Sequence, residues 1–207
     1  MSKHKKEIIE RVRQTEVKAA EGGSVIDGRP IVFNSPTDIG GWFEETIRPG
    51  ALDEADLSDV RFCKNHDTSN VFARSKNGKG TMELTPDDEG LLMSAEVDAA
   101  GNPLAATLYS EVSRGDIDGM SFMFTVDEEI WEDLDTEYPK RFITKIGTVL
   151  EVSAVTFPAY PQTTISARAK ETLENVRSMA EAAQALKQAE ADKELELEKE
   201  KIKLLSI

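Results

Sequence analysis

The C-terminal stretch of the chain, residues 166–207, contains neither glycine nor proline, although the whole chain has 13 glycines and 8 prolines. Ala, Glu, Lys and Leu dominate it, and these residues favour helix. Apolar residues recur at three-to-four spacing, at Leu173, Val176, Ala180, Ala183 and Leu186. We therefore expect a long C-terminal helix. Its charged half, residues 190–203, interleaves both signs, which is typical of a solvated single helix or a coiled-coil arm; a specific docking arm is the alternative.

The preceding region has the opposite texture, because turn residues separate short apolar runs. Extended segments are predicted at residues 60–64, 119–126 and 141–157. The Asp27-Gly28 signal between two short apolar runs predicts a small hairpin at residues 24–33. Residues 158–161, PAYP, predict a turn.

One helix is predicted inside this strand-rich region. Asn102 can cap the first amides of a helix, and Pro103 suits its first position. An apolar stripe then continues to a stop at Gly115, formed by Leu104, Leu108 and Val112.

The N-terminal segment is predicted to be a short helix, because Ile8, Ile9 and Val12 lie at helical spacing before Gly22 and Gly23. The sequence therefore divides into three predicted parts: a helical leader at residues 1–22, a folded domain at 23–168, and a charged helical arm at 169–207. The fold class is α+β.

Composition excludes several classes of function. Hydrophobic residues make up 39% of the chain, and no apolar run approaches the roughly 20 residues that span a bilayer, so we expect no membrane segment. The N-terminus lacks the apolar stretch of a secretory signal. A net charge of −14 disfavours binding to nucleic acid. Cys63 is the single cysteine, which rules out an internal disulfide and a thiolate-rich metal site.

Imidazole chemistry has essentially one candidate, because the chain has two histidines and His4 lies in the charged leader. His66 follows the strand predicted at 60–64, on which Val60, Phe62, Lys64 and His66 would share one face. A histidine at a strand end is a candidate general base. Taken alone, a histidine there is more often a surface or hydrogen-bonding residue than a catalyst.

Two further residues complete a candidate constellation. Ser121 is a small hydroxyl on a strand whose other face would carry Met120, Phe122 and Phe124. The motif alone does not displace the simpler interpretation of a serine tolerated at a strand start. Glu151 lies in an otherwise apolar stretch, where an unpaired carboxylate would be costly. Its partner is either the histidine ring N–H or a lysine or arginine. Asp67 and Ser153 are the reserve candidates for orienting the imidazole.

Taken together, residues 24–168 resemble the prohead (procapsid) protease family of tailed phages, whose fold is similar to that of herpesvirus assembly proteases. The resemblance is carried by VF (32–33), GGWFEE (40–45), PGAL (49–52), FCKNHD (62–67), GMSF (119–122), LEVS (150–153) and PAYP (158–161). It implies a compact β-barrel flanked by helices. It also implies Ser121 as nucleophile and His66 as general base, with Glu151 as the third member. Relatives commonly have glycine where this chain has Met123.

The resemblance further implies a serine endopeptidase that acts inside the immature capsid in the bacterial host cytoplasm. It would cleave scaffolding segments of the capsid protein, and itself, without a cofactor. Whether it forms homo-oligomers is left open. The alternative is a non-catalytic scaffolding or capsid-assembly factor that engages shell subunits through its charged helix. A metal-dependent hydrolase is disfavoured, because His66, Cys63 and scattered carboxylates make a poor zinc set.

Overall fold

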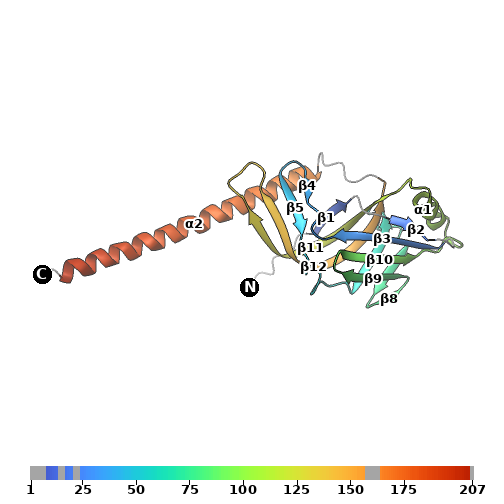
Figure 1. Cartoon of the computed structure of the whole chain (residues 1–207), viewed down its shortest axis with the longest axis horizontal. Coiled ribbons are helices and arrows are strands. Elements are labelled where there is room, and N and C mark those ends of the chain that lie inside the picture. Colours follow the sequence, from blue (N-terminus) through green and yellow to red (C-terminus); the bar gives the residue numbers. More distant parts are fainter. Residues whose placement is uncertain (1–7, 14–16, 21–23, 157–163, 206–207) are drawn as a thin grey trace.

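The computed structural model describes residues 8–13, 17–20, 24–156 and 164–205. These residues form two sheets and two helices (Figure 1). The strands are β1 (Ile8–Arg13), β2 (Val17–Ala19), β3 (Val25–Val32), β4 (Thr37–Ile39), β5 (Phe43–Ile47), β6 (Asp59–Lys64), β7 (Ala73–Lys76), β8 (Lys79–Gly80), β9 (Met82–Asp87), β10 (Gly90–Glu96), β11 (Gly119–Glu132) and β12 (Lys140–Val155). The helices are α1 (Pro103–Ser113) and α2 (Thr164–Leu205). Neither helix, over its described length, is apolar enough to cross a membrane.

The larger sheet has eight strands and is organised around β12. One edge of β12 pairs antiparallel with β11. Its other edge pairs parallel with β5 over residues 140–143 and with β6 over residues 151–154. β1 is added antiparallel to the remaining edge of β11, while β7 and β8 follow β6, and β4 pairs with β5. Register shifts along the β11–β12 pair allow these two long strands to bend.

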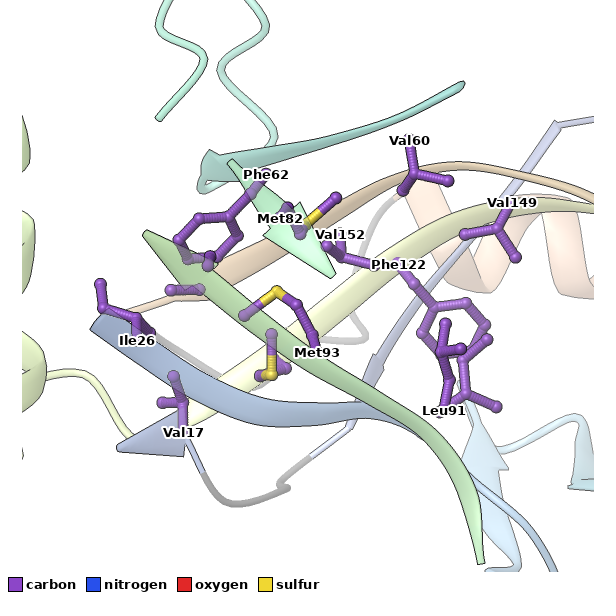
Figure 2. Close-up of a cluster of buried hydrophobic side chains, with 14 of the residues drawn as sticks. Val17, Ile26, Val60, Phe62, Met82, Leu91, Met93, Phe122, Val149 and Val152 are labelled. Carbon is purple, nitrogen blue, oxygen red and sulfur yellow. The ribbon is translucent and has the colours of Figure 1, made fainter. Parts of the chain in front are cut away.

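The second sheet has four strands in the order β2-β3-β10-β9. The main hydrophobic core lies between the two sheets (Figure 2). Alternate residues of β11, namely Met120, Phe122 and Phe124, are fully buried in it, as the sequence predicted. The second sheet contributes Ile26, Ile31, Leu91, Met93 and Ala95. Because Met120 and Phe122 flank Ser121, the packing of this core fixes the position of the serine.

Replacement of Phe122 by alanine is expected to lower the free energy of unfolding by about 3–5 kcal/mol, because a fully buried ring is lost and a cavity remains. Urea denaturation would measure the loss. Phe142, which is only partly buried, offers the matched control, and Phe142→Ala should cost clearly less. Equal losses for the two variants would contradict this account of the core.

The predicted mixed α+β class is confirmed, but the predicted closed barrel is not found among the described residues. The path of the larger sheet ends at β1 on one side and at β8 on the other. β8 comprises only Lys79 and Gly80, and a short edge strand with a lysine is a usual way to end a sheet. The likeness to the herpesvirus protease fold stays a prediction.

The predicted helical leader is wrong for the residues that the structure describes, which form β1 and β2. The backbone of β1 bonds to the edge of β11, and Ile9 packs against the core. These long-range contacts outweigh a weak helical pattern. The predicted hairpin at residues 24–33 is also wrong. Both edges of β3 are paired, with β2 and with β10, so Asp27 and Gly28 lie within a continuous strand.

Helix α1 begins as predicted, because the Asn102 side chain accepts a hydrogen bond of 3.0 Å from the Leu104 amide. The predicted apolar stripe is correct for Leu108 and Val112, which are buried. Leu104 is 53% exposed, and Ala105 is buried in its place. Ala105, and not Leu104 as predicted, therefore packs against the core, and its small side chain allows α1 to lie close to the core.

The long C-terminal helix is confirmed as α2, which extends away from the sheets (Figure 1). Its beginning is part of the folded body. Ala169 and Leu173 are buried against Ile39 and Phe43, and Arg177 donates a hydrogen bond of 2.9 Å to the Leu134 carbonyl. Beyond these contacts the described side chains are exposed, up to residue 199. The predicted turn at 158–161 lies outside the described residues.

Candidate active site

His66 lies in a tight turn directly after β6. Asn65 and His66 both have positive φ, of 52° and 59°, a conformation that is uncommon without glycine. The turn is held against the end of β12, because the Asn65 amide donates to the Ala154 carbonyl and the Thr156 amide donates to Asn65 Oδ1, each at 3.0 Å. His66 thus does not continue the face of Val60, Phe62 and Lys64 as the sequence predicted. The left-handed turn carries its ring over the sheet.

Ser121 is buried near the beginning of β11, with its side chain on the face opposite the core. Its neighbours across the sheet are Ser153 on β12 and Val12 on β1. Ser121 Oγ lies 2.6 Å from His66 Nε2, and it also donates a hydrogen bond of 2.9 Å to the Arg11 carbonyl. A serine hydroxyl and an imidazole within hydrogen-bond distance form a potential nucleophile and base.

Glu151 lies on β12 and is 2% exposed. Its Oε2 is 2.6 Å from His66 Nδ1, so the structure shows the pairing with histidine that the sequence left open. Ser153 lies two residues further along the same face of β12. Its hydroxyl donates to Glu151 Oε1 and accepts a hydrogen bond of 3.0 Å from the His66 amide. Ser153 therefore holds the carboxylate and the histidine backbone together.

Asp67, the other reserve candidate, belongs to the turn rather than to the imidazole. It accepts hydrogen bonds from the Ser69 amide at 3.0 Å and from the Asn70 side chain at 2.6 Å. Hydrogen bonds from Ser69 and Asn70 lower the pKa of Asp67, which is consistent with a carboxylate that stabilises the loop after His66. Of the two reserve residues, Ser153 is the one that contacts Glu151.

Ser121, His66 and Glu151 thus form one hydrogen-bonded chain across β11, the β6 turn and β12. A comparison with protein families matches residues 11–178 to the family described as caudovirus prohead serine protease. The chain belongs to this family. Comparisons with curated proteins and with solved structures each found no match. The family predicted from the sequence is confirmed, and the matched region includes Ser121, His66 and Glu151.

The imidazole of this prohead protease family member has an acidic environment. Burial alone would lower the pKa of His66, but the hydrogen bond and charge of Glu151 and the charge of Glu10 outweigh burial, so the pKa is raised. Glu10 Oε1, on β1, lies 3.3 Å from His66 Nε2. The sequence did not single out Glu10, because only the pairing of β1 with β11 places it near residue 66.

Cys63 lies beside the site but is not a competing nucleophile. The thiol is buried at the end of β6, and burial, followed by the charge of Glu151, raises its pKa to about 12. It is therefore protonated and unreactive near neutral pH. Among the described residues, no group of three His, Cys, Asp or Glu side chains is arranged to hold a metal ion.

Met123 occupies the position at which the resemblance to the family led us to expect glycine. It lies opposite Glu151 on one side and Glu10 on the other, just before a register shift in the β11–β12 pair. Its φ is not positive, so the backbone there does not require glycine. With methionine at this position, residues 119–123 of β11 remain regularly paired with β12.

A separate hollow of about 820 Å³ lies on the four-stranded sheet. Its lining mixes charges and apolar groups, including Lys18, Arg29, Glu83 and Leu92, and it contains none of the three hydrogen-bonded residues. The candidate site on the β11–β12 face therefore lies apart from this hollow.

Proposed function

We propose that the chain is a serine endopeptidase of prohead maturation in which Ser121 is the nucleophile, His66 the general base and Glu151 the residue that orients the imidazole. One observation carries the proposal. Ser121 Oγ and Glu151 Oε2 each lie 2.6 Å from opposite nitrogens of the His66 ring. A hydroxyl, a base and a carboxylate in this order are the parts that acyl transfer requires.

In the first half of the cycle, Ser121 Oγ attacks the carbonyl carbon of a peptide bond while His66 Nε2 takes the hydroxyl proton. The carbon–nitrogen bond then breaks, and the imidazolium returns that proton to the leaving amine. An acyl ester remains on Ser121. In the second half, His66 accepts a proton from water, the resulting hydroxide equivalent attacks the ester, and Ser121 recovers its proton.

Glu151 acts on the base rather than on the substrate. By accepting the Nδ1 proton it keeps Nε2 free to take the proton of Ser121, and its charge stabilises the imidazolium formed during attack. Ser153 supports this role through its bonds to both Glu151 and the His66 amide. None of these steps requires a cofactor.

The proposed substrates are scaffolding segments of the phage capsid protein, cleaved inside the immature capsid in the host. Family membership supports this assignment. The chain itself is a second proposed substrate, in residues 166–190. The exposed part of α2 supports the second proposal, because weakly packed exposed segments are where cleavage concentrates. On this view the protease unit predicted at residues 23–168 also includes β1, β2 and the packed beginning of α2, and the exposed rest of α2 is an arm.

Incubation with the cognate capsid precursor, followed by mass spectrometry over time, tests the proposal. The wild-type chain is expected to release discrete precursor fragments and to lose its own C-terminal arm within residues 166–190. His66→Ala should do neither. Precursor that stays whole with the wild-type chain would refute the endopeptidase function. Precursor that is cut while the chain stays intact would refute only self-cleavage.

A non-catalytic assembly factor is the second candidate, and the exposed length of α2 is the observation that favours it. The two functions differ in what they require of Ser121. Phage carrying Ser121→Ala should assemble shells that retain uncut capsid precursor if the chain is a protease. Normal maturation with this variant would support the assembly factor.

A further inference from the structure

The edge of β11 beside Ser121 is occupied by the chain's own N-terminal strand (Figure 1). β1 runs antiparallel to β11, with Val12 opposite Ser121 and Arg11 opposite Phe122. The carbonyl oxygen of Arg11 accepts a hydrogen bond of 2.9 Å from Ser121 Oγ. Extended peptides commonly bind by adding a strand to a sheet edge. β1 therefore lies where a substrate strand would bind, with the Arg11 carbonyl group facing Ser121 Oγ.

The side chain of Arg11 enters a buried acidic site. Its Nε and Nη2 atoms donate to the two carboxylate oxygens of Glu45 at 2.6 and 2.7 Å, a bidentate geometry that suits arginine. Glu45 is fully buried, and it also accepts a hydrogen bond of 3.0 Å from Arg141 Nη1. If Arg11 leaves, Arg141 still partly neutralises the carboxylate. The site can thus exchange one basic side chain for another without leaving Glu45 uncompensated.

A count of hydrogens shows how β1 can occupy the site without being attacked by Ser121. Ser121 has one hydroxyl proton but faces two acceptors, the Arg11 carbonyl and a neutral His66 Nε2. A protonated imidazole resolves the conflict. Nε2–H then points to Ser121 Oγ and to Glu10, while the hydroxyl proton goes to the Arg11 carbonyl. In this arrangement His66 cannot act as a base, so β1 holds the site at rest.

We propose that β1 occupies the place of the substrate: the edge of β11 beside Ser121 binds the peptide strand to be cut, and Glu45 selects a basic side chain at the residue whose carbonyl Ser121 attacks. This inference rests on the proposed function, because it assigns a subsite to the same nucleophile. It makes Glu45 a specificity-determining residue and β1 an internal competitor of the substrate.

Active-site phosphonates test the selectivity on the full chain without altering Glu45. A peptidyl diphenyl phosphonate forms a Ser121 Oγ–phosphorus bond and loses phenoxide, which takes the proton released from Oγ. The probe with an arginine side chain should label the protein at least about tenfold faster than the probe with a norleucine side chain, because only the former bonds to a charged partner. Equal rates, or faster labelling by norleucine, would overturn the proposal.

The occupancy of the edge is tested with a cross-strand lock. Ile8 and Thr125 are register partners on β1 and β11, so the double variant I8C/T125C can join the two strands by a disulfide. Native Cys63 stays out of the exchange because its thiol is buried and its pKa is about 12. Oxidation should slow labelling by the arginine probe at least about tenfold, and reduction should restore it. Labelling that is the same in both states would refute the occupancy.

A third probe separates this inference from the proposed function. A simple fluorophosphonate without an amino-acid side chain should label the wild-type chain, or Arg11→Ala if β1 blocks the wild type, and should not label Ser121→Ala. Failure to label any variant would refute the serine protease itself. Labelling that depends on Ser121, together with equal arginine and norleucine rates, would refute the specificity site alone.

Discussion

Replacing Ser121 by alanine is expected to lower kcat for peptide cleavage by about a millionfold, the scale on which loss of a catalytic serine acts in proteases of this chemistry. The reason is geometric. Oγ is the atom 2.6 Å from the imidazole, and no cysteine thiolate is available nearby to replace it, because Cys63 stays protonated. Cleavage of the capsid precursor, quantified by mass spectrometry, gives the rate.

Ser75 offers a matched control, because it is a buried serine on β7 of the same sheet. Ser75→Ala should fold and cleave at nearly the wild-type rate. Substrate binding should survive in Ser121→Ala, since the hydroxyl is small and the strands around it are unchanged. A residual rate of a tenth or more of wild type in Ser121→Ala would rule out Ser121 as the nucleophile.

Local anomalies singled out the three residues of the candidate site in the sequence, and the resemblance to the prohead protease family assigned their roles. Glu151 interrupts an apolar strand, Ser121 interrupts a run of large side chains, and His66 is the sole histidine outside the leader. Local anomalies of this kind are expected at functional sites. The sequence pattern could not predict the hydrogen bonds that hold the three residues in place. The sequence offers Ser153 as a reserve candidate for orienting the imidazole, but its hydrogen bonds to Glu151 and to the His66 amide became visible only in the structure.

Contacts between distant parts of the sequence explain the errors in the fold. The pattern Ile8, Ile9, Val12 fits a helix, yet these residues lie on a strand whose partner is more than 100 positions away. No local signal reports that β11 has a free edge. The same limit hid the Arg11–Glu45 ion pair, which joins residues 34 positions apart. The strands β7 to β10 have short, mixed patterns and became visible only through their pairing.

Glu151→Gln is expected to lower kcat by about ten-thousandfold while leaving the fold intact, as replacement of the orienting carboxylate does in other serine proteases. Ser153 donates its proton to Oε1 of the carboxylate, so the amide oxygen of glutamine should face Ser153 and the amide NH₂ should face His66 Nδ1. The imidazole then keeps its proton on Nε2 and cannot accept one from Ser121. Glu111→Gln is the matched control and should keep activity. Glu111 lies on α1, and its carboxylate pairs with Lys64 of β6.

The pH dependence distinguishes this orienting role from a purely structural one. In the wild type the base form of His66 appears as pH rises through a pKa that Glu151 holds above the ordinary 6.5. In Glu151→Gln, burial still lowers that pKa, but the charge of Glu151 that raised it is gone. The titration of His66 should therefore move to lower pH. Proton NMR of the His66 ring would show the shift, with His4→Gln used to assign the two histidine signals. An unchanged His66 titration would contradict the electrostatic role of Glu151.

The raised pKa of His66 also makes the stability of the fold depend on pH, because the folded and unfolded states bind the His66 proton with different affinity. Because the folded protein binds the His66 proton more tightly than the unfolded chain, protonation stabilises the fold. This stabilisation is complete below about pH 6.5, the ordinary value, and is lost as pH rises through the raised value in the folded state. Activity requires the deprotonated base, so the protein should become active over the pH range in which this contribution to stability disappears. Glu151→Gln should move both dependences to lower pH, because the same ion pair with Glu151 raises the pKa that governs them.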